Sequence, residues 1–179
     1  MSLKPPLEAL ASAEKIHDQA TIEAALERMA TEINTRLHDA NPLWITVMNG
    51  GLHTSAELTM RLNFPVEMDY CHATRYRGET SGGNLLWRAM PATTLRDRVV
   101  VLCDDILDEG KTLAAIKRHA NAQGAKQVLI AVLAKKLHDR CVPGLVADFQ
   151  GLTVPDRYVF GYGMDYSGSL RNLPSIYAL

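Results

Sequence analysis

The stretch VVVLCDDILDEGKTL, residues 99–113, decides the fold expected for this chain. Its opening run VVVLC is rich in β-branched residues and is typical of a strand buried on both faces. The acidic pair Asp104-Asp105 follows this run, Gly110 marks a tight turn, and a helical pattern then extends to Ala122. A strand that leads through a short loop into a helix is the repeating unit of an α/β protein.

The segments on either side continue the alternation of strands and helices. The apolar runs at 43–48 and 127–134 predict two more buried strands, and the apolar spacing over 22–37 predicts an amphipathic helix. We further expect a helix over 54–63 capped by Thr54 or Ser55, a strand that begins after Pro65, a returning hairpin arm at 85–90, and weaker strands near 146–150 and 157–161. The predicted architecture is an open, mostly parallel twisted sheet flanked by helices, in one domain over residues 1–179. Ligands bind such sheets beyond the carboxyl ends of the strands.

Composition restricts the classes of function. A net charge of −1, with no basic block, gives no electrostatic support for binding nucleic acid. Cys71, Cys103 and Cys141 are far apart and show no metal-site spacing, so we expect inert thiols in a reducing compartment. The N-terminus lacks the apolar region of a secretory signal, and no apolar run approaches the ~20 residues needed to span a bilayer. We therefore expect a cytoplasmic protein with no membrane or nucleic-acid partner.

The acidic residues after the strand and the loop that follows them suit a ligand that carries hydroxyl groups at one end and a phosphate at the other. Asp104 and Asp105 suit hydroxyl groups or Mg²⁺, whereas backbone N–H groups at the helix start near Gly110 suit a phosphate. Ribose 5-phosphate meets both demands. Solvated loop carboxylates are the simpler interpretation, but the pair followed by Asp-Glu-Gly-Lys-Thr makes it the weaker one. An ATP-binding P-loop is rejected, because Asp105 stands where its first glycine is needed.

With these residues in place, the chain resembles the type I phosphoribosyltransferases, closest to their hypoxanthine-guanine branch, over about Ala13 to Leu179. The resemblance implies a small hood over the sheet and a flexible active-site loop. It also implies that Asp104 and Asp105 bind the ribose hydroxyls of phosphoribosyl pyrophosphate (PRPP), directly or through Mg²⁺. The implied 5-phosphate loop comprises Asp108, Glu109, Gly110, Lys111 and Thr112. Glu109 departs from the family, which has Ser or Thr there, and Asp108 is the expected general acid or base at purine N7.

The same resemblance assigns residues to pyrophosphate and to loop closure. MNGG at 48–51 matches the pyrophosphate loop, in which Asn49 replaces a basic residue and precedes Gly50. Arg171 is the second pyrophosphate contact. The polar segment that begins Arg75-Tyr76-Arg77 matches the flexible loop, and we expect Arg75 or Arg77 to supply the charge that Asn49 lacks.

The base-binding residues follow from two further segments. Lys135 or Lys136 ends the strand QVLIAVLA, and alignment on the family pattern favours Lys135 as the donor to purine O6. In RYVFGYGMDY, Tyr158 would stack on the purine, the Val159 backbone would read its edge, and Asp165 would hold a second Mg²⁺.

The activity implied by the resemblance is Mg²⁺-dependent transfer of ribose 5-phosphate from PRPP to hypoxanthine or guanine, which yields IMP or GMP. One alternative is a related nucleotide-sensing regulator that binds RNA, for which a basic surface is required. Another is a relative that prefers xanthine, since the purine 2-position is read largely by backbone groups. The family pattern implies a homodimer or homotetramer.

Overall fold

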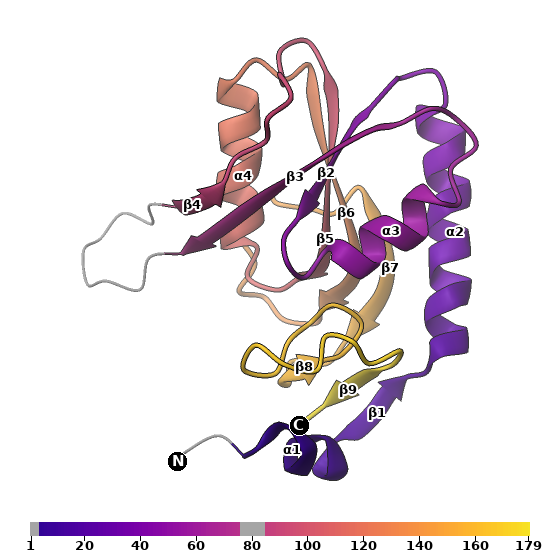
Figure 1. Ribbon diagram of the computed structural model, residues 1–179, viewed down its shortest axis with the longest axis vertical. Helices are drawn as coiled ribbons and strands as arrows, with labels where there is room; N and C mark the ends of the chain where they lie inside the picture. The colour runs from indigo at the N-terminus through magenta and orange to yellow at the C-terminus, as the bar shows by residue number, and fades with distance from the viewer. Residues whose placement is uncertain (1–3, 76–84) are drawn as a thin grey trace.

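The computed structural model describes residues 4–75 and 85–179, and a six-stranded sheet lies at its centre (Figure 1). The strand order is β4-β3-β2-β5-β6-β7, with β4 antiparallel to β3 and the other neighbours parallel. The strands are β2 (Leu43–Val47), β3 (Glu67–Arg75), β4 (Leu85–Ala89), β5 (Val99–Leu107), β6 (Gln127–Lys136) and β7 (Phe149–Val154). The open, mostly parallel sheet expected from the sequence is confirmed.

Helices cover both faces of this sheet, and each face has its own hydrophobic core. On one face α2 (Gln19–Leu37) and α3 (Leu52–Thr59) pack over a core that includes Trp44 and Phe149. On the other face α4 (Lys111–Ala122) packs over a second core (Figure 1). Such burial stabilises the sheet from both sides and leaves the carboxyl ends of the parallel strands at one edge.

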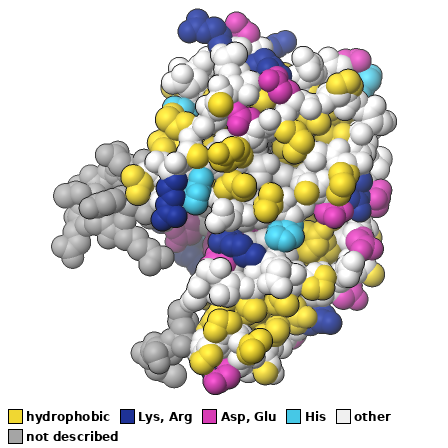
Figure 2. Space-filling model, viewed as in Figure 1, with side chains coloured by type: hydrophobic (Ala, Val, Ile, Leu, Met, Phe, Trp, Pro, Cys, Tyr) yellow, Lys and Arg dark blue, Asp and Glu magenta, His cyan; other side chains and the backbone are white. Residues whose placement is uncertain are grey.

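A small antiparallel sheet forms a hood below that edge. It has the order β1-β9-β8, from β1 (Glu14–His17), β9 (Ile176–Ala178) and β8 (Val159–Phe160), and α1 (Pro6–Ser12) packs beside it. Figure 1 shows that the C-terminus lies at this hood. In the face drawn in Figure 2, hydrophobic side chains gather on the hood, and Lys or Arg and His side chains lie between it and the body.

Several boundaries differ from those expected. β5 continues past the acidic pair to Leu107, because its ladder with β6 extends that far. β7 begins at Phe149, three residues after the expected start. The helix α3 begins after Gly51, so neither Thr54 nor Ser55 is its cap; both are buried inside it.

Two further features concern the helices and the cysteine thiols. None of the helices in the described part of the chain is long and apolar enough to cross a membrane. The three cysteines are free thiols, and burial raises the pKa of Cys71 to about 12. That thiol is therefore held in its protonated, unreactive form.

Candidate active site

The loop between β5 and α4 encloses a small cavity suited to an anion. Its volume is about 280 Å³, and it is lined by residues 104–106 and 108–113. Gly110 has a φ of 72°, and a Cβ there would lie 2.4 Å from Cδ2 of Leu145, so the turn requires glycine. Because the first N–H groups of a helix lack intrahelical partners, the start of α4 can donate to a phosphate here.

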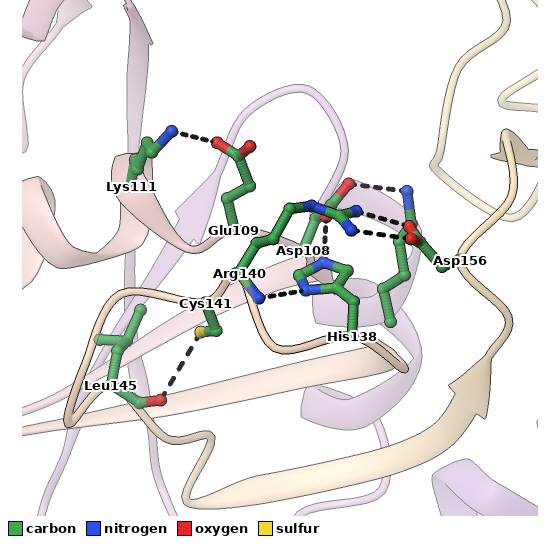
Figure 3. Close-up of polar contacts among 9 residues, drawn as sticks. Asp108, Glu109, Lys111, His138, Arg140, Cys141, Leu145 and Asp156 are labelled. Carbon is green, nitrogen blue, oxygen red and sulfur yellow. Dashed lines mark hydrogen bonds and ion pairs between the residues drawn. The ribbon is translucent and has the colours of Figure 1, made fainter.

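Glu109, the residue that departs from the family pattern, is paired within this loop. Its Oε2 lies 2.5 Å from Nζ of Lys111, and both side chains are partly exposed (Figure 3). The backbone carbonyl of Glu109 also accepts a hydrogen bond from the Val142 N–H at 2.9 Å. The Glu109 carboxylate is thus partly neutralised by Lys111 at the rim of the anion cavity.

A larger cleft of about 530 Å³ adjoins the anion cavity, and Asp104, Asp105 and Asp108 line both. The cleft lies at the carboxyl ends of the parallel strands and is bounded below by residues of the hood segment. Parts of the chain that are far apart in the sequence therefore meet around one space. The predicted site residues that line the cleft are Asn49, Gly50, Asp104, Asp105, Asp108, Thr112, Tyr158, Val159, Asp165 and Arg171.

Burial disfavours ionisation of the acidic pair. Burial, together with repulsion from Asp105, raises the pKa of Asp104 well above its ordinary value. Burial also raises the pKa of Asp105, although the Arg171 guanidinium opposes the shift. Two adjacent carboxylates in such a setting favour either a proton or a cation.

The turn after β2 lies directly against this pair. A Cβ on Gly50 would lie 2.1 Å from Oδ2 of Asp105, so only glycine allows this approach. The peptide bond between Met48 and Asn49 is cis. Asn49 and Gly50 both line the cleft, as the sequence predicted.

Arg171 joins the far wall of the cleft to the acidic pair. Its Nη2 donates to Oδ1 of Asp165 at 2.8 Å, and its Nη1 lies 3.8 Å from Oδ2 of Asp105. Nη1 also donates to the Gly163 carbonyl at 2.5 Å. The predicted pair of Arg171 and Asp165 is therefore brought together, with the guanidinium partly exposed.

At the end of β6 the lysine that faces the cleft is one residue later than expected. Lys136 lines the cleft and Lys135, the residue chosen from the sequence, does not. Nζ of Lys136 donates to Oδ2 of Asp108 at 2.7 Å. The strand β6 continues through both lysines, and successive side chains of a strand point to opposite faces, so only one of them can face the cleft.

Tyr158 and Val159 approach the cleft from the hood. Tyr158 has 44% of its surface exposed, while Val159 is buried as the first residue of β8. Val159 pairs with Ala178 of β9, which fixes the strand beside the cleft. The ring of Tyr158 packs edge-on against Tyr166 at 5.4 Å.

The remaining expectations concern the predicted flexible loop. Arg75 is the last residue of β3, while Tyr76 and Arg77 lie outside the residues that the structure describes. The structure also adds a residue that the sequence did not single out. His138 donates to or accepts from Asp108 at 2.6 Å, and nothing in its local sequence pattern indicates this contact.

Comparison with known proteins gives a consistent result. The family model described as a phosphoribosyl transferase domain matches residues 12–166. The hypoxanthine-guanine phosphoribosyltransferase of Bacillus subtilis (strain 168) is 32% identical over 156 residues, which cover 87% of this chain and 86% of that protein. The hypoxanthine-guanine-xanthine phosphoribosyltransferase of Tritrichomonas foetus is 29% identical over 161 residues, or 90% and 88% of the two chains. A solved structure of a hypoxanthine-guanine-xanthine phosphoribosyltransferase superimposes with a TM-score of 0.84 at 25% identity, covering 93% of this chain and 96% of the other.

Proposed function

Because this chain belongs to the phosphoribosyl transferase domain family and has the type I phosphoribosyltransferase fold, we propose that it acts in purine salvage. The proposed reaction transfers ribose 5-phosphate from PRPP to N9 of hypoxanthine or guanine, which forms IMP or GMP and releases pyrophosphate. One observation carries the proposal: an anion cavity at the start of α4 opens into a cleft with a largely buried acidic pair and a cationic side chain.

The two adjoining cavities suit the two ends of PRPP. The 5-phosphate would bind in the loop from Asp108 to Thr112, where the helix start supplies donors. The ribose hydroxyls would then reach Asp104 and Asp105. Pyrophosphate would lie beside Gly50 and Arg171, which both line the cleft and approach Oδ2 of Asp105.

The carboxylates fit a magnesium ion that arrives with its substrate. In the described part of the chain no group of three or more His, Cys, Asp or Glu side chains could hold a metal alone. Mg²⁺ is usually bound through one or two carboxylates together with substrate phosphates. Asp104 and Asp105, whose pKa values are raised by burial, would be stabilised by such a cation, and Asp165 offers a second contact. The bound ion would neutralise the charge that develops on pyrophosphate.

Base recognition is proposed for the opposite wall. Lys136, rather than Lys135, would donate to O6 of the purine, because its ammonium faces the cleft. Tyr158 would stack on the ring, and the backbone of Val159 would read the base edge. Adenine carries an amino group at this position and cannot accept the bond, so the site favours 6-oxopurines.

Asp108 would handle the proton at N7. It lines both cavities, so a base held by Lys136 and a ribose held by the acidic pair would meet beside it. Burial alone raises the pKa of Asp108, but hydrogen bonds from Lys136 and His138 outweigh it, and the pKa lies below its ordinary value. Asp108 is therefore a carboxylate at neutral pH, ready to accept a proton.

We also propose an oligomeric state and a cellular location. Large hydrophobic side chains on or beside β3 and β4 are about half exposed, which supports a homodimer or homotetramer of the single-domain chain 1–179. They are Met68, Tyr70, Leu86 and Met90. The free thiols support a cytoplasmic location. Light scattering coupled to size-exclusion chromatography measures the assembly directly.

A panel of bases tests the proposed function. Pyrophosphate release would be followed with PRPP, Mg²⁺ and hypoxanthine, guanine, xanthine, adenine or uracil. We expect high kcat/KM values for hypoxanthine and guanine and very low ones for adenine and uracil. Preference for adenine or uracil would refute the proposal, and a preference for xanthine would replace its substrate.

A further inference from the structure

His138 is a buried histidine that contacts the carboxylate proposed to handle the N7 proton. It lies in the loop after β6, and its side chain is 3% exposed. Its Nε2 lies 2.6 Å from Oδ1 of Asp108, and its Nδ1 lies 3.0 Å from the backbone nitrogen of Arg140 (Figure 3). Both ring nitrogens therefore have partners.

These two partners determine which nitrogen of the neutral ring carries the proton. The Arg140 backbone N–H can only donate, so Nδ1 of His138 must be the acceptor and carries no proton. In the neutral ring the proton is then on Nε2, which donates to Asp108. Protonation of Nδ1 would break the bond from Arg140.

With the bond from His138, each carboxylate oxygen of Asp108 has a donor. Lys136 binds Oδ2 at 2.7 Å and His138 binds Oδ1 at 2.6 Å, so donors on both oxygens fix the rotation of the carboxylate. Both donors stabilise the ionised form. Other charged groups near this network are Glu109 and Lys111 in the phosphate loop, Asp139 and Arg140 after β6, and Asp156 before β8.

The loop that carries His138 is itself tied to the segment between β7 and β8, which leads into the hood. The guanidinium of Arg140 binds both carboxylate oxygens of Asp156, at 2.8 Å and 2.6 Å (Figure 3). A bidentate pair of this kind fixes orientation as well as distance. The same residue thus anchors the loop through its side chain and orients His138 through its backbone.

We propose that His138 is a positioning residue: its neutral ring donates from Nε2 to Asp108 and holds that carboxylate, ionised and oriented, toward purine N7. This inference rests on the proposed function for the role of Asp108. His138 itself touches no reacting atom in the proposal. Its effect on Asp108 should therefore be seen in the free protein as well as in turnover.

The first test uses the free protein and needs no enzymatic activity. Long-range ¹⁵N–¹H correlation spectra of the His138 ring distinguish the two neutral tautomers, and ¹³C spectra follow titration of the Asp108 carboxyl. We expect the Nε2–H tautomer in the wild type, and a higher Asp108 pKa in His138→Phe than in His138→Gln, whose amide can still donate. An Nδ1–H tautomer would overturn the inference, whatever the reaction proves to be.

The second test is kinetic. Loss of a hydrogen bond to a charged group should lower kcat with hypoxanthine by roughly 10–100-fold in His138→Phe, with little change in KM for PRPP. The acid limb of its pH profile should move to higher pH, because Asp108 would need less acid to become protonated. His138→Gln should recover most of kcat and the wild-type acid limb. His38→Gln, at an exposed histidine outside the site, should match the wild type.

The outcomes separate positioning from a purely structural role. A lower kcat with an unmoved acid limb and no recovery in His138→Gln would overturn the inference, as would wild-type kinetics in His138→Phe. If His138→Phe does not fold, the tautomer and the Asp108 titrations in the wild type and His138→Gln decide the question. A wild type that transfers no phosphoribosyl group would refute the proposed function but leave the spectroscopic test intact.

Discussion

Nζ of Lys136 lies 2.7 Å from Oδ2 of Asp108, which joins the proposed base-recognition cation to the proposed proton acceptor. The two residues come from the ends of neighbouring parallel strands, β6 and β5. A purine that binds Lys136 through O6 would therefore present N7, on the same side of the ring, to Asp108. In the proposed mechanism this ion pair would couple recognition of the base to proton transfer.

Replacement of Lys136 tests base recognition. Lys136→Ala should lower kcat/KM for hypoxanthine by about 10–100-fold, because a charged donor to O6 is lost. It should not create good adenine activity, since no acceptor for the amino group is supplied. Lys135→Ala is the matched control and should retain near wild-type kinetics. The reverse result, with Lys135 essential and Lys136 dispensable, would contradict the geometry of β6.

Removal of the Asp108 charge tests proton transfer. Asp108→Asn should keep PRPP affinity and slow turnover by ~10²–10⁴-fold, the range for loss of a general acid or base. Pre-steady-state kinetics separate the chemical step from product release. An unchanged rate of the chemical step would exclude Asp108 from the reaction.

The wild-type pH profile follows from the same carboxylate. Hydrogen bonds from Lys136 and His138 outweigh burial and place the Asp108 pKa below its ordinary value. The ionised form is needed to accept a proton, so kcat at saturating PRPP and Mg²⁺, which would keep the acidic pair ionised, should persist at mildly acidic pH and fall only below the ordinary range of an aspartate. Measurement of kcat against pH under these conditions, with protein stability checked at each point, would show an acid limb near neutral pH if this account were incorrect.

Charge in the phosphate loop is tested at Glu109. Glu109→Thr removes the ion pair with Lys111 and restores a hydroxyl, so KM for PRPP should fall by roughly 2–5-fold, a modest change because both side chains are partly exposed. Glu109→Gln separates the loss of charge from the gain of the hydroxyl. A KM that is equal in all three proteins would mean that the backbone alone holds the phosphate.

The acidic pair should lower the stability of the free protein and strengthen Mg²⁺-dependent PRPP binding. The folded-state pKa of Asp104 is raised by burial and by Asp105, so ionisation destabilises the free protein as pH rises through that value. Asp104→Asn should therefore raise the melting temperature near neutral pH, less so in acid, and weaken Mg²⁺-dependent PRPP binding. Asp39→Asn, at an exposed carboxylate, is the control. A lower melting temperature for Asp104→Asn at neutral pH would contradict this expectation.

Features that depend on neighbouring residues in the sequence were predicted, whereas features that depend on distant residues were not. The strand start and the helix start of 99–113 are marked by local signals and were predicted correctly, whereas the strand extends through the acidic pair to Leu107. The cap of α3 was not, because the hydroxyl of Ser55 serves tertiary contacts instead. It accepts hydrogen bonds from Trp44 and Thr46 of β2.

Long-range pairing accounts for the other differences. Which of Lys135 and Lys136 faces the cleft depends on the register of β6 against β5, where Leu107 pairs with Lys135. The strands β1 and β9 are short and pair only with distant segments, so no local periodicity indicates them. The contact of His138 with Asp108 was not predicted either, because the two residues lie 30 positions apart in the sequence.

Identification of the product tests the central claim most directly. The wild-type protein would be incubated with PRPP, Mg²⁺ and hypoxanthine, and the mixture resolved by chromatography with mass detection. The account predicts IMP and pyrophosphate in equal amounts, with both products lost in excess EDTA. Release of pyrophosphate with ribose 5-phosphate in place of IMP, or no consumption of PRPP, would contradict it.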